Sequence, residues 1–202
     1  MKSATPAERR PYRQQARAAA AAENTRRIVE AAEELFSRRY YDEVTLDDVA
    51  RTAGVGLQTL IRRFPTKEEL VDGVVAVASS RIKAQRGQAP AGDVAGIVGN
   101  LADHYEATGD MTILLLAQEE RVPPFARATA GGRRMHRGWV EQVFAPQLRG
   151  LAPAARERRT VQLVVLCDVY VWKVMRRDQN FTRAQYERAL REMIDRLIEE
   201  DS

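Results

Sequence analysis

The residues best suited to specific chemistry in this sequence fall within one short segment between Gly56 and Phe64. The segment carries Leu57, Gln58, Thr59, Arg62 and Arg63. A glutamine amide forms a bidentate pair with adenine, and a threonine methyl group packs against the methyl group of thymine in the major groove of DNA. Arginine pairs with guanine or holds a phosphate. We therefore expect Gln58 and Thr59 to read bases, while Arg62 and Arg63 contribute affinity.

Two predicted helices around a glycine turn would present this segment on the surface. Thr45 stands as an N-cap before Leu46, so the first of these helices is expected from Leu46 to Gly54, where glycine turns the chain sharply. The second is expected from Gly56 to Arg63. Apolar residues on the facing sides hold such a pair together and leave the outer face of the second helix free. The alternative is an ordinary helical hairpin whose arginines are only solvated.

The excess positive charge of the chain lies in its N-terminal part. Residues 1–86 hold 16 Lys and Arg against 12 Asp and Glu, whereas the remaining residues hold 16 of each. Residues 1–22 form a basic arm, predicted to be flexible, that suits phosphates or the minor groove; a solvated tail is the alternative. Thr45 and Lys67 stand at predicted helix N-termini, where backbone N–H groups and the helix dipole favour a phosphate.

The rest of the chain has helical periodicity, and no segment alternates as a half-buried strand would. We expect an all-α protein of about nine helices, with a three-helix head that contains the helix-turn-helix and a larger helical domain. The first helix is expected from Asn24 to Arg39, with a backward extension through the alanine run Ala16–Ala22 as the alternative to a flexible arm. One long helix is expected from Pro153 to Arg177. Glycine and proline interrupt the pattern at Gly87–Gly92. The predicted parts are therefore the arm (1–22), the head with its connecting helix (23–86) and the larger domain (87–202).

Several classes of protein are disfavoured by the composition. The chain has one cysteine, Cys167, and two histidines, His104 and His136, without metal-ligand spacing or a nucleophile signature. We therefore expect no metal, no cofactor and no enzymatic activity, with a thiol-dependent enzyme as a remote alternative. No apolar run reaches the length of a membrane span, and no secretory leader precedes the first helix, so we expect a cytoplasmic protein.

The segment TLDDVARTAGVGLQTLIRRFPTKEELV, with the preceding RRIVEAAEELFSRRYYDEV, resembles the N-terminal domain of the TetR family of transcriptional regulators. The shared pattern covers residues 24 to about 75. It includes a hydrophobic first helix, a capped second helix, Gly-Val at the turn and Phe-Pro-Thr-Lys-Glu at the start of the fourth helix. The C-terminal half is similar in character to family regulatory domains in ILLLAQEERVPPF and DVYVWKVMRRD, a much less specific match.

This sequence departs from the family pattern at positions that bear on DNA contact. Gly56 stands where Ser or Thr usually caps the recognition helix, and Gln58 replaces a small residue. Ile61 occupies the usual Tyr position, which removes a phenol contact to phosphate, and Arg63 replaces His or Tyr. We therefore expect the motif to survive with an altered base preference.

The resemblance implies a repressor that binds a palindromic double-stranded DNA operator as a homodimer and is released by an unknown small-molecule effector. The last two helices would form the dimer interface, and their apolar residues support this, although a buried helix in a monomer is the alternative. The predicted interface residues are Val161, Val165, Val169, Trp172, Leu190, Ile194 and Leu197. Candidates for the effector pocket are aromatic, sulfur-containing or isolated polar residues on apolar helices, with simple core packing as the alternative for each. They are Tyr105, Met111, Leu115, Gln118, Trp139, Phe144, Cys167 and Tyr170.

Two other functions fit a helical DNA-binding protein. One is a DNA-binding protein that responds to no ligand, and the other is an architectural protein that binds DNA without sequence preference. A comparison of operator DNA with scrambled DNA at one fixed salt concentration separates the second from a specific regulator.

Overall fold

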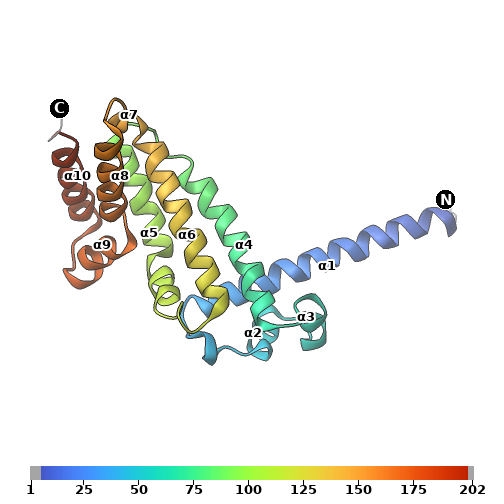
Figure 1. Cartoon of the computed structure of the whole chain (residues 1–202). Coiled ribbons are helices and arrows are strands. Elements are labelled where there is room, and N and C mark those ends of the chain that lie inside the picture. Colours follow the sequence, from blue (N-terminus) through green and yellow to red (C-terminus); the bar gives the residue numbers. More distant parts are fainter. Residues whose placement is uncertain (1–5, 200–202) are drawn as a thin grey trace. The chain divides into compact units, whose positions relative to one another are not determined.

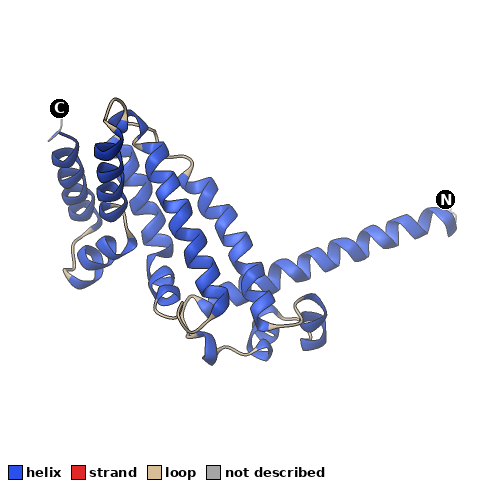
Figure 2. Cartoon of the chain, viewed as in Figure 1, coloured by secondary structure: helices blue, strands red, loops and turns tan. Residues whose placement is uncertain are grey.

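Most of residues 6–199 is helical. The computed structural model describes residues 6–199, and within that range it contains helices and no strand (Figures 1 and 2), which confirms the all-α prediction. The elements in chain order are α1 (Pro6–Phe36), η1 (Tyr41–Glu43), α2 (Leu46–Ala53), α3 (Leu57–Arg63), α4 (Lys67–Arg86), α5 (Val94–Leu116), α6 (Pro123–Val143), α7 (Ala145–Leu148), α8 (Pro153–Leu166), α9 (Val169–Lys173), η2 (Val174–Asp178) and α10 (Arg183–Glu199).

The helices form two compact units, which divide between Val74 and Val75, inside α4. The predicted boundary lay later, at Gly87–Gly92. In the structure this stretch connects α4 to α5 within the second unit, where the N–H of Gly92 donates to the carbonyl of Val143 at 2.8 Å. The glycine-rich stretch is therefore a hydrogen-bonded loop of the second unit.

The first helix is much longer than its predicted span. It begins at Pro6, whereas the apolar stripe predicted a start near Asn24. The residues between include the alanine-rich stretch 16–22, and alanine has the highest intrinsic helix propensity. Residues 6–22 of the predicted flexible arm are thus helical, and residues 1–5 lie outside the described part. Residues 17–22 are exposed, so this part of α1 is not buried by the rest of its unit.

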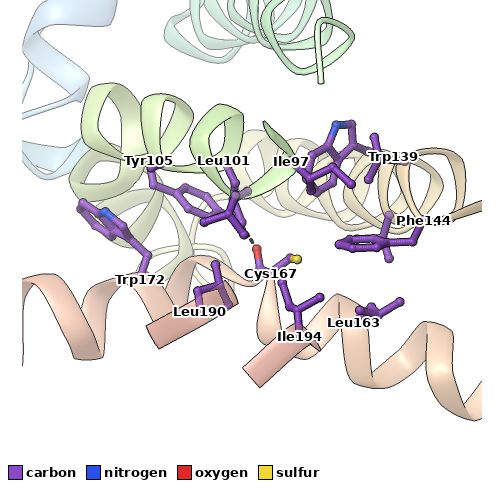
Figure 3. Close-up of a cluster of buried hydrophobic side chains, with 14 of the residues drawn as sticks. Ile97, Leu101, Tyr105, Trp139, Phe144, Leu163, Cys167, Trp172, Leu190 and Ile194 are labelled. Atoms are coloured by element: carbon purple, nitrogen blue, oxygen red, sulfur yellow. Dashed lines mark hydrogen bonds between the residues drawn. The ribbon is translucent and has the colours of Figure 1, made fainter. Parts of the chain in front are cut away.

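The core of the second unit is one cluster of side chains from α5 to α10 (Figure 3). Its largest fully buried members include Trp172, Tyr186 and Phe144. Burial of a side chain of this size stabilises the folded state by roughly 1.5–3 kcal/mol. The hydroxyl of Tyr105, buried in the same cluster, donates to the carbonyl of Cys167 at 2.9 Å. The one polar atom of the Tyr105 side chain is therefore hydrogen-bonded although it is buried.

The long helix predicted from Pro153 to Arg177 is broken. Helix α8 ends at Leu166, and α9 begins after Asp168, whose carboxylate accepts the N–H of Tyr170 at 2.9 Å. Aspartate is among the preferred N-cap residues because its side chain satisfies a backbone donor that the helix itself leaves free. A local cap thus overrides a continuous apolar pattern.

A glycine of α5 permits close packing against the largest core residue. A Cβ atom on Gly109 would lie 2.4 Å from Cζ3 of Trp172, which is fully buried. We expect Gly109→Ala to lower the free energy of unfolding by about 1–3 kcal/mol, because a packed core cannot accommodate the added methyl group. The control is Gly99→Ala in the same helix, where nothing lies within 4 Å of the added atom. It should be neutral or stabilising by up to about 1 kcal/mol. Urea unfolding measures both, and equal effects would contradict the expectation.

Candidate nucleic-acid interface

A glycine turn and two caps define α2 and α3. Gly54 has φ 62° and ψ 39°, a left-handed conformation that glycine adopts without strain, and its N–H donates to the carbonyl of Arg51 at 3.1 Å. Thr45 Oγ1 accepts the N–H of Asp48 at 3.0 Å, and Asp48 Oδ2 accepts the N–H of Thr45 at 3.1 Å. Gly56 occupies the N-cap of α3 with an extended backbone. The helix-turn-helix thus has the caps and the turn that its sequence predicts.

Apolar packing holds the two helices together. Val49 and Ala50 of α2 are buried, as is Leu60 of α3, and Ile28 of α1 contributes to the same small core. Helix α3 has seven residues, and an isolated helix of that length is not stable in water. Its conformation therefore depends on the burial of Leu60, and the face opposite Leu60 is left in solvent.

The solvent face of α3 carries the predicted base readers. Gln58 and Arg62 are exposed and stand four residues apart, on one side of the helix. Within residues 6–199 neither side chain takes part in a hydrogen bond or ion pair. Leu57 is 37% exposed, and Thr59 is half-buried. The structure thus brings a free amide and a free guanidinium together on one accessible surface.

Three other predicted DNA contacts are engaged within the protein. Arg63 Nε donates to Thr25 Oγ1 at 3.1 Å. Lys67 Nζ donates to the carbonyl of Tyr41 and lies 3.8 Å from the centroid of the Tyr41 ring, and burial lowers the pKa of Lys67. The Thr45 hydroxyl belongs to the capping box described above. A phosphate contact from any of these side chains would compete with an intramolecular bond.

A functional residue outside the motif was not predicted. Arg27 of α1 donates through Nη2 to the carbonyl of Ala53 and, at 2.9 Å, to that of Gly54. These carbonyls belong to the turn between α2 and α3, so Arg27 fixes the turn from a neighbouring helix. An arginine beside an apolar stripe gives no signal of a contact some 26 residues away in sequence, so the motif alone could not reveal it.

The predicted effector-pocket residues separate into two groups. Four of them, Tyr105, Trp139, Phe144 and Cys167, are buried in the core cluster of the second unit (Figure 3). Gln118 is also buried, and its Nε2 donates to the carbonyl of Leu114 at 2.9 Å. Met111 and Leu115 are half-buried, and Tyr170 is 52% exposed, away from the cluster. The structure therefore brings Tyr105, Trp139, Phe144 and Cys167 together in one cluster, and Met111, Leu115 and Tyr170 are not members of it.

The predicted dimer interface needs correction. Val169, Trp172, Leu190 and Ile194 are buried in the core of their own unit and present no surface to a second copy. The other three predicted residues remain accessible, with Val165 57% exposed. They line an open groove formed by Val161, Gln162, Val165, Leu166, Met193, Arg196 and Leu197. An apolar period identifies buried positions but not the molecule that covers them.

The cysteine and the two histidines of the second unit are held in their neutral forms. Burial raises the pKa of the Cys167 thiol to about 12, so the thiolate that nucleophilic chemistry requires is not formed near neutral pH. Burial and then the charge of Arg86 lower the pKa of His104 to about 3, and the same causes lower the pKa of His136. These shifts argue against a thiol-imidazole pair.

The described residues, 6–199, contain neither a metal-binding cluster nor a membrane-spanning helix. No group of three or more His, Cys, Asp or Glu side chains is arranged to hold a metal ion there. Nor does any helix in that range combine the length and apolar character that a membrane crossing requires.

The sequence of the helix-turn-helix region matches a known family. Residues 28–74 match the model of the bacterial regulatory proteins of the tetR family, which confirms the resemblance found in the sequence. The match spans the second part of α1, all of α2 and α3, and the start of α4. None of the curated proteins matches this chain in sequence.

Solved structures of transcriptional regulators share the fold over both units. A regulator from Rhodococcus sp. Rha1 has a TM-score of 0.68 at 17% identity, covering 87% of this chain and 96% of that one. A tetR-family regulator from Streptomyces coelicolor has a TM-score of 0.65 at 22% identity, covering 86% and 81%. GusR of Salmonella enterica has a TM-score of 0.68 at 18% identity, covering 87% and 95%. At these identities the similarity shows the fold alone.

The contacts of Arg27 generate a test of the helix-turn-helix geometry. We expect Arg27→Ala to lower the free energy of unfolding by about 1.5–3 kcal/mol, because two backbone carbonyls lose a charged donor. DNA affinity should fall on all sequences together. The control is Arg26→Ala, because Arg26 only forms exposed ion pairs with Glu23 and Glu30 and should leave stability nearly unchanged. Urea unfolding and fluorescence anisotropy with labelled DNA measure both variants. Equal losses would show that Arg27 is not a special support of the turn.

Proposed function

We propose that this chain, a DNA-binding transcriptional regulator of the TetR family, is a repressor that binds a palindromic operator as a homodimer and leaves it when a small molecule binds the second unit. The observation that carries the proposal is the solvent face of α3, where Gln58 and Arg62 are exposed four residues apart and have no partner among the side chains that the structure describes. Such a protein works where the chromosome is, in the bacterial cytoplasm.

Sequence reading is assigned to α3. A single helix fits the major groove, where the Gln58 amide forms a bidentate pair with adenine and the methyl group of Thr59 meets a thymine. Arg62 pairs with guanine or holds a phosphate. The rest of the proposed contact surface touches the phosphates of the DNA backbone or lies close to the DNA. It consists of Arg63, Thr45, Lys67, Gly56 and Leu57. Arg63 donates to Thr25 within the protein, so its phosphate contact would have to replace that bond.

The N-terminal part of α1 is assigned to nonspecific affinity. Residues 17–22 are exposed, and the sequence before Asn24 carries more basic than acidic residues. A helix that bears surplus positive charge and is not covered by its own unit suits the DNA phosphates. The arm therefore adds affinity without adding base preference.

Dimerisation is assigned to the open groove between α8 and α10. Two recognition helices must enter successive major grooves about 34–36 Å apart, so a symmetric pair of copies is needed to read a palindrome. Exposed apolar residues on α8, Val161 and Val165, adjoin Leu197 and Met193 of α10. A second copy that covers this groove removes apolar surface from water, which favours association.

Release by an effector is assigned to the second unit. A small-molecule site there would act on the spacing of the two reading heads, because a rigid-body shift breaks several base contacts at once. The main alternative is a specific DNA-binding protein that responds to no ligand. It predicts the same operator binding, unchanged by any small molecule.

Base reading by Gln58 has a direct test. A selection from random DNA gives the preferred operator of the wild-type protein and of each variant. We expect Gln58→Ala to change the preferred base at one position of each half-site and to cost about 1–3 kcal/mol on the wild-type operator. Arg62→Ala is the comparison variant, and Lys67→Ala, as a phosphate contact, should weaken binding about equally on all sequences.

The outcome of that selection decides between functions. An unchanged base preference in Gln58→Ala would remove this residue as a reader. Equal affinity of the wild-type protein for its selected operator and for scrambled DNA, at one fixed salt concentration, would point to a nonspecific architectural protein.

The dimer groove has a separate test. We expect Val165→Asp to give a folded monomer at micromolar concentration, because the interface would have to bury an unpaired carboxylate. Operator affinity should then fall at least about tenfold, since two half-sites no longer act through one linked pair. The control is Val77→Asp on α4, where the valine is 50% exposed outside this groove. Sedimentation velocity measures the oligomeric state, and a dimeric Val165→Asp protein would exclude this groove.

A further inference from the structure

A positively charged side chain lies inside the second unit. Arg86, in the last turn of α4, has only 5% of its surface exposed. Its Cζ atom lies 3.8 Å from the ring centroid of Trp139 and 6.0 Å from that of Tyr105, and both rings belong to the core cluster in Figure 3. Burial lowers the pKa of Arg86, yet a guanidinium remains protonated in proteins. The core of this unit therefore contains a cation.

No carboxylate within residues 6–199 forms an ion pair with Arg86. Its Nη2 contacts Nδ1 of His136 at 3.3 Å, and its guanidinium also hydrogen-bonds the Tyr105 side chain. The other groups that act on its charge are Cys167 and Tyr186. All four are neutral at pH 7. Nε of Arg86 is buried and has no hydrogen-bond partner. A buried charged donor without an acceptor is unfavourable, so this guanidinium is suited to an anion.

His136 holds the guanidinium in place without neutralising it. Its Nε2 lies 3.1 Å from the carbonyl oxygen of Val164, which can only accept a hydrogen bond. Nε2 therefore carries the imidazole proton, and Nδ1 accepts from Arg86. Burial lowers the pKa of His136, which keeps the ring in this neutral form. His136 is thus a positioning residue for Arg86.

The helix end and the aromatic ring beside Arg86 favour its positive charge but do not give its Nε a hydrogen-bond acceptor. The last turn of a helix favours a cation, and so does the face of a tryptophan ring. Neither supplies an acceptor for Nε. Arg177 offers a comparison, because its Cζ lies 4.4 Å from the centroid of the Trp172 ring while its nitrogens donate to both oxygens of Asp110 at 2.9 Å. The two arginines share an aromatic contact and differ in the carboxylate.

We propose that Arg86 recognises the carboxylate of an organic effector whose apolar body packs against Trp139 and Tyr105. The inference rests on the proposed function, because it names the chemical class of the effector. One guanidinium neutralises one negative charge, so a carboxylate matches the site, whereas a phosphate dianion would leave a charge uncompensated in an aromatic core. A guanidinium donates to a carboxylate through parallel N–H groups, and Nε would then gain an acceptor.

The position of Arg86 links the site to the DNA-binding unit along the chain. Helix α4 runs without a break from Lys67 to Arg86 and crosses the division between the units. It begins soon after α3 ends at Arg63. An acid that draws the guanidinium from the face of Trp139 acts on the last turn of the helix that follows the reading helix. Ligand binding at Arg86 is therefore placed to change operator affinity.

The test compares acids with their neutral amides. Calorimetric titrations of the full-length protein use three pairs: benzoate and benzamide, phenylacetate and phenylacetamide, and octanoate and octanamide. We expect at least one acid to bind at least tenfold more tightly than its amide and to weaken binding to the selected operator. Equal binding within all three pairs, including no binding by any of them, would overturn the proposal.

Two substitutions separate recognition from a purely structural role. Arg86→Gln keeps hydrogen-bonding capacity and removes the charge, and Arg86→Met removes both. We expect both variants to lose the preference for acid over amide, with melting temperatures equal to or above that of the wild-type protein, because an unpaired buried charge has been removed. The control Arg177→Gln should keep the preference. A fall in melting temperature in both variants as large as that of Gly109→Ala would show a structural arginine and overturn the proposal.

Operator binding without added acid separates the two proposals. A protein that prefers acids through Arg86 but prefers no DNA sequence would contradict the proposed function and support this site. A protein that binds a selected operator but does not distinguish acid from amide would contradict this site alone.

Discussion

A helix of seven residues does not keep its shape in water, so the solvent face of α3, which is the proposed reading surface, depends on one packing contact: the burial of Leu60 against α2 and α1. That contact orients α3 and assigns its two faces. The buried face has no role in recognition, and the other is left with polar side chains that nothing in the unit occupies. Arg27 supports the same arrangement from α1 by holding the carbonyls of the turn. The two faces of this short helix thus have different roles: the buried face stabilises the unit, and the solvent face is free for the proposed recognition of DNA.

Local signals explain how much of this unit could be predicted. The cap at Thr45 and the left-handed Gly54 are each decided by residues within about one helical turn, and an apolar period decides which face of a helix is buried. These local features therefore predict the helix-turn-helix and its exposed face from the sequence alone. The contact of Arg27 could not be predicted in this way, because a side chain that reaches a distant backbone carbonyl leaves no periodic pattern.

The second unit was less predictable because its features depend on tertiary contacts. An apolar stripe does not say which neighbour covers it, so Trp172 and Leu190 appeared available to a second copy although their own unit buries them. The break at Asp168 depends on its N-cap hydrogen bond to Tyr170, whereas the valines on both sides of it form a continuous apolar pattern that predicts an unbroken helix. Arg86 reads in the sequence as a basic residue of a helix terminus, and only the packing of α6 and α5 around it reveals a charge without a carboxylate.

The two histidines of the second unit have a consequence for how the protein responds to acid. A histidine in an unfolded chain binds a proton below about pH 6.5. In the folded unit, His104 resists protonation down to about pH 3, and His136 is shifted in the same direction. Because the unfolded state then binds more protons than the folded one, stability declines as the pH falls below about 6.5, towards the lower folded-state values. A fall in pH below about 6.5 would therefore lower the stability of this unit as a whole.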